Sequence, residues 1–236
     1  MTNEKRKPLH TSRRGFLGQA LTAAGAAIGA PAVIHAPQGD SHPPPTLAAG
    51  ETQISLQING KTHSLALEPR VTLLDALREK LGLTGSKKGC DRGQCGACTV
   101  LIDGQRVYSC LTLAVMQEGK AITTIEGLAS GEQLHPMQTA FLDNDGFQCG
   151  YCTPGQICAS VALLGEVQRG AASAITPELS QPPQLATLST AEIRERLSGN
   201  LCRCSAYNGI VAAVQQAAGQ TPPSPAATVQ VQEVKA

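Results

Sequence analysis

The sequence predicts an α+β protein in which a small β-sheet domain is followed by an all-helical domain. Alternating apolar residues mark two hairpins in the first half, with one amphipathic helix between them. From about residue 135 the apolar residues recur at helical spacing instead. The nine cysteines fall only within these two regions. A chain of 236 residues is long enough for two such domains.

Both ends of the chain are predicted to lie outside these domains. Residues 1–36 have the layout of a twin-arginine export signal, with a basic start, the pair Arg13 and Arg14, and a mild Ala- and Gly-rich stretch. That stretch is too weakly apolar for a membrane anchor, and the alternative is a basic amphipathic tail. Residues 37–50 are interpreted as a disordered linker and residues 218–236 as a disordered tail. We therefore expect a periplasmic protein that the twin-arginine machinery exports already folded.

The composition argues against several classes of function. There are 19 Lys and Arg against 18 Asp and Glu, whereas nucleic-acid-binding proteins are usually strongly basic on one face. The run "GSKKG" lacks the spacing of a phosphate-binding loop, and no nucleophile–base pair is evident. There is no Trp, so the core must come mainly from Leu, Ile, Val and Ala. We expect neither nucleic-acid binding nor a catalytic residue on this chain.

The first domain is predicted to span residues 51–127. The run "TQISLQINGKTHSLALEP" alternates and reverses at an Asn-Gly pair, the preferred dipeptide of a type I′ hairpin turn. A helix follows in "VTLLDALREKLGL", with Thr72 as its cap and Gly82 at its end. A second hairpin turns at an Asp-Gly pair, and "AITTIEGL" is expected to form a last strand over residues 121–128. Two hairpins around one helix indicate a β-grasp-like domain.

A cysteine-rich loop lies between that helix and the second hairpin. Its spacing is Cys90-x4-Cys95-x2-Cys98, and Cys110 follows after the hairpin. This is the plant-type spacing of a [2Fe–2S] cluster, whose four thiolates must converge on a compact body. Zinc is the competing metal, but structural zinc sites favour paired knuckles, often with His. Here the first gap is four residues and the loop holds no His.

Glycines and basic residues surround these cysteines. Gly89, Gly93 and Gly96 are expected to adopt positive φ and to let backbone N–H groups point at the sulfurs. Such hydrogen bonds stabilise a reduced cluster and tune its potential. The basic residues are interpreted as solvated surface charge, with neutralisation of an anionic cluster or contact with a partner as the alternatives; they are Lys87, Lys88 and Arg92.

The second domain is predicted to span residues 128–217 and to contain four helices. They are expected in "HPMQTAFLDNDG", "CTPGQICASVALLGEVQRG", "STAEIRERLSGN" and "YNGIVAAVQQAAG". Ser189 and Glu192 are predicted to form a capping box for a helix that ends at Gly199. Residues 170–186 are interpreted as a polar surface excursion. Four helices with short or surface connections indicate a small bundle.

A second set of four cysteines sits at helix junctions, as Cys149 and Cys152 in "QCGYC" and Cys202 and Cys204 in "LCRC". The spacing alone also permits a zinc site, disulfides or a C-x-x-C redox dithiol. The first set and the export signal favour a second [2Fe–2S] cluster. Cys158 is left over at core spacing on one of the helices, so we expect a buried, inert thiol there.

Four runs in this order, "GCDRGQCGACTV", "HPMQ", "FQCGYCTPG" and "GNLCRC", resemble the iron–sulfur subunit of the xanthine oxidase family of molybdenum hydroxylases. The resemblance covers about residues 51–217. With the export signal, the chain is most similar to the small subunits of bacterial periplasmic aldehyde oxidoreductases. The resemblance implies a plant-type ferredoxin-like β-grasp domain followed by a four-helix-bundle domain, each with one [2Fe–2S] cluster.

The resemblance also implies site residues and partners. It implies an outer cluster nearer the flavin, held by Cys90, Cys95, Cys98 and Cys110. It implies an inner cluster nearer the molybdenum cofactor, held by Cys149, Cys152, Cys202 and Cys204. Gln148 is expected to contact the pterin across the subunit boundary. The implied partners are a molybdenum-cofactor subunit and an FAD subunit, together forming a heterotrimer.

The implied function is electron transfer from the molybdenum cofactor, through both clusters, to FAD, while a partner subunit oxidises an aldehyde to a carboxylic acid. The alternatives are the small subunit of a related xanthine or CO dehydrogenase-type hydroxylase, a free-standing two-cluster periplasmic carrier, and a disulfide-stabilised secreted protein. The chain departs from many relatives after "LCRC", where Ser205 and Ala206 replace Thr and Gly, and in a longer stretch over residues 170–186. Neither departure touches an expected ligand.

Overall fold

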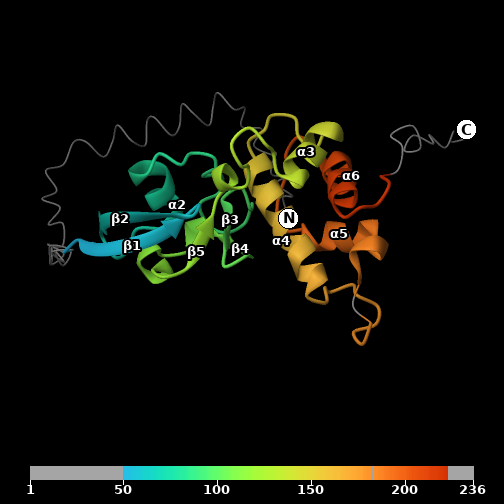
Figure 1. The fold of residues 1–236 in the computed structure, drawn as a ribbon, viewed down its shortest axis with the longest axis horizontal. Coiled ribbons are helices and arrows are strands. Elements are labelled where there is room, and N and C mark those ends of the chain that lie inside the picture. Colours follow the sequence, from blue (N-terminus) through green and yellow to red (C-terminus); the bar gives the residue numbers. More distant parts are fainter. Residues whose placement is uncertain (1–49, 182, 223–236) are drawn as a thin grey trace, which may run out of the picture. The chain divides into compact units, whose positions relative to one another are not determined.

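The computed structural model describes residues 50–181 and 183–222 of the chain. The predicted export signal with Arg13 and Arg14, the predicted linker except Gly50, and residues 223–236 of the predicted tail lie outside the described residues. The described part begins with a β-sheet and one short helix and ends with four α-helices (Figure 1). The order of the two structural classes is therefore the one predicted.

The sheet has five strands, in the order β2-β1-β5-β3-β4. Strands β1 and β5 are parallel, and the other neighbours are antiparallel. The two hairpins with a helix between them are the elements that the sequence predicted, and the structure adds the parallel pairing of β1 with β5 (Figure 1). The strands are β1 (Thr52–Ile58), β2 (Lys61–Leu67), β3 (Thr99–Ile102), β4 (Gln105–Tyr108) and β5 (Ala121–Thr123).

Both hairpin turns have the predicted chemistry. Asn59 and Gly60 have φ of 51° and 74°, and Asp103 and Gly104 have φ of 51° and 75°. A type I′ turn requires positive φ at both central residues, which Asn, Asp and Gly tolerate best. The turns therefore set the strand register, which places the apolar residues of β1 on the buried face: Ile54, Leu56 and Ile58.

The helix between the hairpins is less regular than predicted. It begins as α2 (Leu73–Asp75), with the Thr72 hydroxyl accepting from the Asp75 N–H at 3.1 Å, and continues as a π-helical turn over Ala76–Lys80. The wider turn closes with the Leu81 N–H donating to the Ala76 carbonyl at 3.2 Å. Gly82 follows at a φ of 68°, as expected for the end of a helix.

The predicted last strand over residues 121–128 is wrong in its second half. Strand β5 covers only Ala121–Thr123, and a 3₁₀ turn over Ile125–Gly127 follows. At Thr124 the Asn59 side chain replaces a backbone partner from the neighbouring strand. The Asn59 amide oxygen accepts from the Thr124 N–H at 2.9 Å, and the Asn59 amide nitrogen donates to the Thr124 hydroxyl at 3.0 Å. A tertiary contact to a hairpin turn thus ends the strand.

The second half folds into four helices around one apolar core. They are α3 (Pro136–Asp143), α4 (Thr153–Gln168), α5 (Thr190–Arg196) and α6 (Tyr207–Ala217). Helix α3 packs against α4 and α6, and α5 packs against α6. The largest fully buried side chains of this core are Met137, Phe141, Leu163, Leu188 and Ile193.

Two details of these helices differ from the prediction. Helix α5 ends at Arg196 rather than near Gly199. Ser189 caps it as predicted, accepting from the Glu192 N–H at 3.1 Å, but the Glu192 carboxylate binds Arg196 instead of completing a capping box. Opposite charge within the buried interior competes better for that carboxylate than a backbone N–H does. At the C-terminus, Gln220 of the predicted tail still donates to two carbonyls of the helical domain.

Helix α4 packs directly against β3 and joins the two domains. Leu101 of β3 forms one buried cluster with Cys158 and Ala162 of α4. Burial raises the pKa of the Cys158 thiol to about 12, and the charge of Glu126 adds to the rise. This matches the prediction of a buried, inert thiol.

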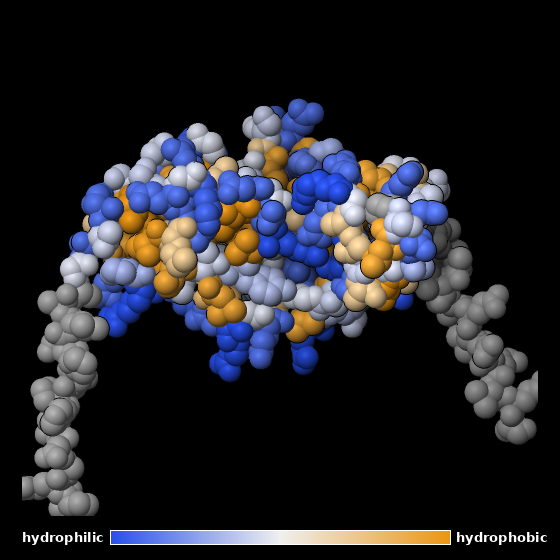
Figure 2. All heavy atoms as spheres, turned by 90° about the horizontal axis from the view of Figure 1, so that it is seen from below, coloured by the Kyte–Doolittle hydropathy of each residue, from blue (hydrophilic) through white to orange (hydrophobic). Residues whose placement is uncertain are grey.

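The outer surface of the described part is mixed in character. Figure 2 shows a face on which hydrophobic residues are interspersed with hydrophilic ones. Among residues 50–181 and 183–222, no helix has the length and apolar character needed to cross a bilayer. The surface does carry large exposed hydrophobic side chains, among them Leu111, Met116, Leu142 and Tyr151.

A glycine in α4 tests the packing between the domains. A Cβ on Gly155 would overlap the Gly96 carbonyl oxygen and lie 3.0 Å from the Ala97 Cα. We expect Gly155→Ala to lower the free energy of unfolding by about 1–3 kcal/mol, the usual cost of overpacking against backbone. Gly165→Ala, on the same helix, would meet only the flexible end of Arg169 and should stabilise by up to ~1 kcal/mol. Thermal unfolding of the intact protein measures both, and equal effects would contradict this packing.

Candidate metal centres

The first set of cysteines lies on the loop before β3 and on the 3₁₀ turn Ser109–Leu111 after β4. Backbone N–H groups point at its sulfurs. The Cys90 sulfur accepts from Arg92 and Gln94, at 3.4 and 3.2 Å. The Cys95 sulfur accepts from the Cys90 N–H at 3.4 Å, and the Cys110 sulfur from the Gly93 N–H at 3.3 Å. The loop backbone therefore surrounds the cysteine sulfurs with N–H groups that donate hydrogen bonds to them.

The sulfurs of this set lie in two pairs. Cys90 contacts Cys95, and Cys98 contacts Cys110. Cys98 and Cys110 are buried and pack against Leu74 of α2, whereas Cys90 and Cys95 are half-buried. One side of the site thus faces the domain interior and the other side lies near the surface.

The glycines of the loop serve two different purposes. Gly93 and Gly96 have φ of 69° and 70°, as predicted. The prediction was wrong for Gly89, which is not among the residues at positive φ. A Cβ at Gly89 would lie 2.8 Å from the Cys95 sulfur, so this glycine provides room for the sulfur. The three glycines let the backbone curl closely around the thiols.

The basic residues of the loop make local contacts. Lys88 forms ion pairs with Asp75 at 2.8 Å and Asp91 at 3.4 Å. Lys87 donates to the carbonyls of Thr84 and Gly85. Lys88 and Arg92 are exposed, in keeping with the predicted surface charge, and the contacts of Lys87 and Lys88 hold the loop from its solvent side.

The second set of cysteines lies where two helix junctions meet. Cys149 and Cys152 come just before α4, and Cys202 and Cys204 come between α5 and α6. Cys149 contacts Cys204, and Cys152 contacts Cys202, so these sulfurs also form two pairs. Each pair takes one sulfur from each junction, which explains why sequence spacing alone left this set ambiguous.

The junction after α5 is held by a tyrosine. The Tyr207 hydroxyl accepts from the Cys202 N–H at 2.8 Å, and the Ala206 N–H donates to the Cys202 sulfur at 3.4 Å. Ser205 has a φ of 60°, which is costly for a residue other than glycine. The departure from Thr-Gly-Tyr at this point thus leaves the tyrosine contact in place.

The exposure of the second set differs from one end to the other. Cys202 is buried, whereas Cys149 and the neighbouring Gln148 are exposed. Phe147 and Tyr151 are exposed aromatic side chains on the same loop. Gln148, expected to contact a pterin, therefore lies at the surface, where a partner can reach it.

The thiols need a cation to ionise fully. Burial and the neighbouring Cys98 raise the pKa of Cys110 to about 11, and burial and Cys202 raise the pKa of Cys152 to about 12. Burial also tends to raise the pKa of Cys90, but the N–H groups of Arg92 and Gln94 outweigh it and bring the pKa to about 7. A bound metal deprotonates coordinating thiols outright.

The donor set of each site fits a diiron cluster. Each iron of a [2Fe–2S] cluster takes two protein thiolates, and each site presents two sulfur pairs with N–H donors directed at the sulfurs. All nine cysteines are free thiols, so neither set is tied up in disulfides. In the described ranges, no three His, Cys, Asp or Glu side chains are placed to hold a single metal ion.

A short segment before Cys202 connects the two sets. The Leu201 N–H donates to the Cys95 carbonyl at 2.9 Å. The buried Asn200 amide donates to the Gly96 carbonyl at 3.0 Å and to the Gly155 carbonyl at 3.2 Å. The hydrogen bond between Leu201 and Cys95 therefore joins the backbone of a first-set cysteine to the residue next to Cys202.

Sequence reasoning missed the residues that make this connection. Asn200 stands in the run "GNLCRC" without a predicted role of its own, and Tyr151 has none either, although its hydroxyl donates to the Lys88 carbonyl at 2.7 Å. The available signal was a polar residue close to a cysteine pair, since Asn200 stands two positions before Cys202 and Tyr151 stands next to Cys152. Two partners of Asn200 are about a hundred positions away in the chain, so no local pattern could identify them.

Two family models match the chain, and together they cover most of its described part. Residues 56–126 match a "2Fe-2S iron-sulfur cluster binding domain", and residues 124–215 match a "[2Fe-2S] binding domain". The chain therefore carries two [2Fe–2S] clusters, which confirms the predicted cofactors.

Known proteins of the same kind align over most of the chain. The aldehyde oxidoreductase iron-sulfur-binding subunit PaoA of Escherichia coli O157:H7 is 53% identical over 212 residues, which are 90% of each chain. The nicotine 6-hydroxylase small subunit of Paenarthrobacter nicotinovorans is 42% identical over 71% of this chain and 90% of its own.

A solved structure supports the same assignment. The match to quinoline 2-oxidoreductase from Pseudomonas putida 86 has a TM-score of 0.60 and 44% identity, and covers 72% of this chain and 93% of that one. These likenesses confirm the resemblance carried by the three cysteine-bearing runs and the run "HPMQ". The chain belongs to the [2Fe–2S] iron–sulfur subunits of the xanthine oxidase family of molybdenum hydroxylases.

Proposed function

We propose that this chain is the electron-transfer subunit of a periplasmic, molybdenum-dependent aldehyde oxidoreductase. It passes electrons from a molybdenum cofactor on one partner subunit to FAD on another. The observation that carries the proposal is the hydrogen-bonded connection between the two thiol sets, from the Cys95 carbonyl to the Leu201 N–H. A relay needs its two centres held at a fixed spacing, and this contact supplies that constraint.

We propose that each thiol set holds one cluster. The outer cluster takes Cys90, Cys95, Cys98 and Cys110, and the inner cluster takes Cys149, Cys152, Cys202 and Cys204. When bound, a [2Fe–2S] cluster accepts and releases one electron at a time. The chain's own residues supply thiolates, direct backbone N–H groups at the sulfurs and shield part of each site from water.

The exposed end of the second set is the proposed contact with the molybdenum-cofactor subunit. Gln148 lies at the surface beside Cys149, and we propose that its amide contacts the pterin. An amide can both donate and accept hydrogen bonds, as the edge of a pterin ring requires.

We propose that the substrate is an aldehyde and that it reacts on a partner subunit. The relatives named PaoA, from two Escherichia coli strains, are aldehyde oxidoreductase subunits and are 53% and 55% identical to this chain. Oxidation of an aldehyde with water as the oxygen source yields a carboxylic acid, two protons and two electrons, and the electrons pass to the relay. The electrons must leave singly, so two one-electron centres in sequence suit the task.

The domain limits are also part of the proposal. We place the β-grasp domain at residues 51–127 and the helical domain at residues 128–217, and we describe the second as a four-helix bundle. The support is that the two matched family models meet at residues 124–126 and that α3 to α6 enclose one core. Residues 1–36 are proposed as the twin-arginine signal.

Purification of the tagged, full-length chain from its host tests the proposed function. We expect it to bring down two larger chains, one with molybdenum and one with flavin, in a complex that oxidises aldehydes faster than purines. A chain that purifies alone with two clusters would identify a free-standing carrier. Faster oxidation of purines would identify a related xanthine dehydrogenase-type hydroxylase.

The cysteine assignment is tested by Cys202→Ser. Cys202 is paired with Cys152, and serine is a poor substitute for a thiolate ligand. We expect electron paramagnetic resonance of the reduced protein to lose one of two cluster signals and to retain the other. Cys158→Ala is the matched control, because this sulfur is buried between Leu101 and Ala162, away from both sets. Two unchanged signals in Cys202→Ser would contradict the assignment of the second set.

The proposed location is tested by changing Arg13 and Arg14 together to Lys. A twin-arginine signal is recognised by that pair, so the protein should accumulate in the cytoplasm. Cell fractionation and immunoblotting measure the distribution. Arg6→Lys, outside the pair, is the control and should leave export unchanged. Normal export of the double variant would rule out a twin-arginine signal.

A further inference from the structure

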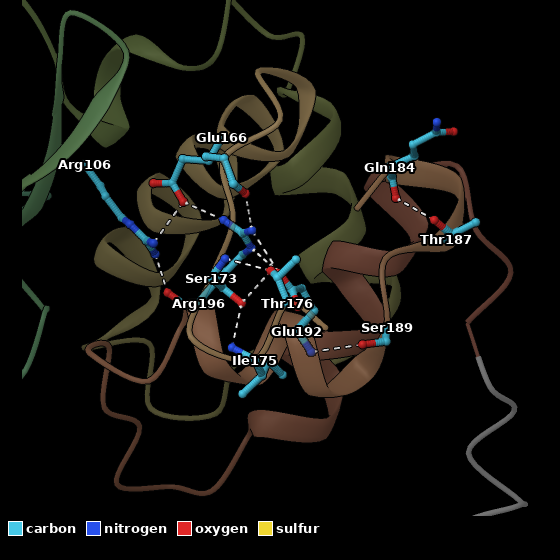
Figure 3. Close-up of polar contacts among 11 residues, drawn as sticks. Arg106, Glu166, Ser173, Ile175, Thr176, Gln184, Thr187, Ser189, Glu192 and Arg196 are labelled. Carbon is cyan, nitrogen blue, oxygen red and sulfur yellow. Dashed lines mark hydrogen bonds and ion pairs between the residues drawn. The ribbon is translucent and has the colours of Figure 1, made fainter. Parts of the chain in front are cut away.

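Two arginines from different parts of the fold meet at one carboxylate. Arg106 lies on β4, and Arg196 is the last residue of α5. Arg106 Nη2 lies 3.0 Å, and Arg196 Nη1 lies 3.4 Å, from Oε2 of Glu166 near the end of α4 (Figure 3). Glu166 therefore links a strand of the sheet to a helix of the second domain through two cations.

The network continues inward from Arg196. Its Nη2 lies 2.9 Å from Oε1 of Glu192, and the two side chains are 3% and 5% exposed. The Thr176 hydroxyl donates to the same Glu192 oxygen at 2.9 Å (Figure 3). Arg196 also donates to the Ala171 carbonyl. Every charge of the network has a partner, as the burial of ions requires. We call Arg106, Glu166, Glu192 and Arg196 the interdomain clamp.

The interdomain clamp holds the segment that connects the two thiol sets. Arg106 donates to the Arg196 carbonyl, and Tyr108, also on β4, donates to the Gly199 carbonyl at 2.9 Å. The next two residues, Asn200 and Leu201, bond to the loop of the first set. Residues 196–201 are thus fixed from the sheet on one side and from the cysteine loop on the other.

We infer that the interdomain clamp positions the two thiol sets relative to each other for electron transfer. The inference rests on the proposed function, because the spacing of the sets matters only if both hold redox centres. A buried ion network is weak evidence for stability, since desolvation offsets much of its attraction. Its directional, fork-shaped contacts instead favour one geometry over others. Its residues are positioning residues and touch no cysteine sulfur.

The structure indicates which member to change. Arg196 and Glu192 are almost fully buried, so loss of either would leave the other charge without its partner. Arg106 is 27% exposed, and Glu166 would keep Arg196 as a partner without it. Arg106→Met retains most of the side-chain volume and removes the donors to Glu166 and to the Arg196 carbonyl.

The test uses the purified, assembled complex with all its cofactors. When both clusters are reduced, each carries an unpaired spin, and the magnetic coupling between them falls steeply with separation. We expect Arg106→Met to weaken or broaden that coupling in electron paramagnetic resonance, with iron content unchanged. Hydrogen exchange of residues 199–201 should accelerate about tenfold or more, the effect of losing a charge-assisted hydrogen bond.

Two further variants make the result specific. Arg194→Met, on the same helix as Arg196, removes an exposed guanidinium that donates to Asn208 and should leave the coupling unchanged. Arg106→Lys should restore part of the coupling, because it returns the charge to Glu166 without the fork of donors.

Unchanged coupling and exchange in Arg106→Met would overturn the inference. Loss of iron from that variant would also overturn it, because Arg106 would then serve folding rather than positioning. A wild-type complex that shows only one cluster signal would instead contradict the proposed function, so the two failures are distinguishable.

Discussion

The structure depends on the contact between the backbone of the first cysteine loop and the segment just before Cys202. The Leu201 N–H donates to the Cys95 carbonyl. The Asn200 side-chain amide donates to the carbonyl of Gly96 in the first domain and to that of Gly155 in the second. An amide buried in this way fixes a geometry, because any shift leaves polar groups without partners. The two thiol sets are therefore joined by direct hydrogen bonds, although they come from domains of different architecture.

The close approach of the domains explains several choices of small residues. A side chain on Gly155 of α4 would collide with the backbone of Gly96 and Ala97, and one on Gly96 would collide with the Asn200 side chain and the Gly199 carbonyl. Further along α4, Cys158 packs against Leu101 of β3 as a small apolar side chain rather than as a ligand. The same logic applies at Gly89, where the space beside the backbone belongs to a sulfur atom. Both the room needed for the sulfurs and the close packing of the two domains therefore require small residues at these positions.

Much of the fold could be predicted because its signals are local. The Asn-Gly and Asp-Gly turns, the Thr72 cap and the spacing of Cys90, Cys95 and Cys98 each act over a few residues. The errors arose where a second side chain competes for the same hydrogen-bonding group, in one case from 65 positions away and in the other from the next turn of the same helix. Asn59 ends strand β5 by bonding Thr124, and Arg196 draws the Glu192 carboxylate away from the cap of its own helix. The pairing of sulfurs from two helix junctions is likewise a tertiary result.

Relay through this chain requires that eight of its nine cysteines hold two separate diiron centres. Analysis of iron and acid-labile sulfide in the natively purified protein tests it most directly. Two [2Fe–2S] clusters require about four iron atoms and about four sulfides per chain. About two irons or fewer per chain, or zinc in place of iron at either set, would contradict the account.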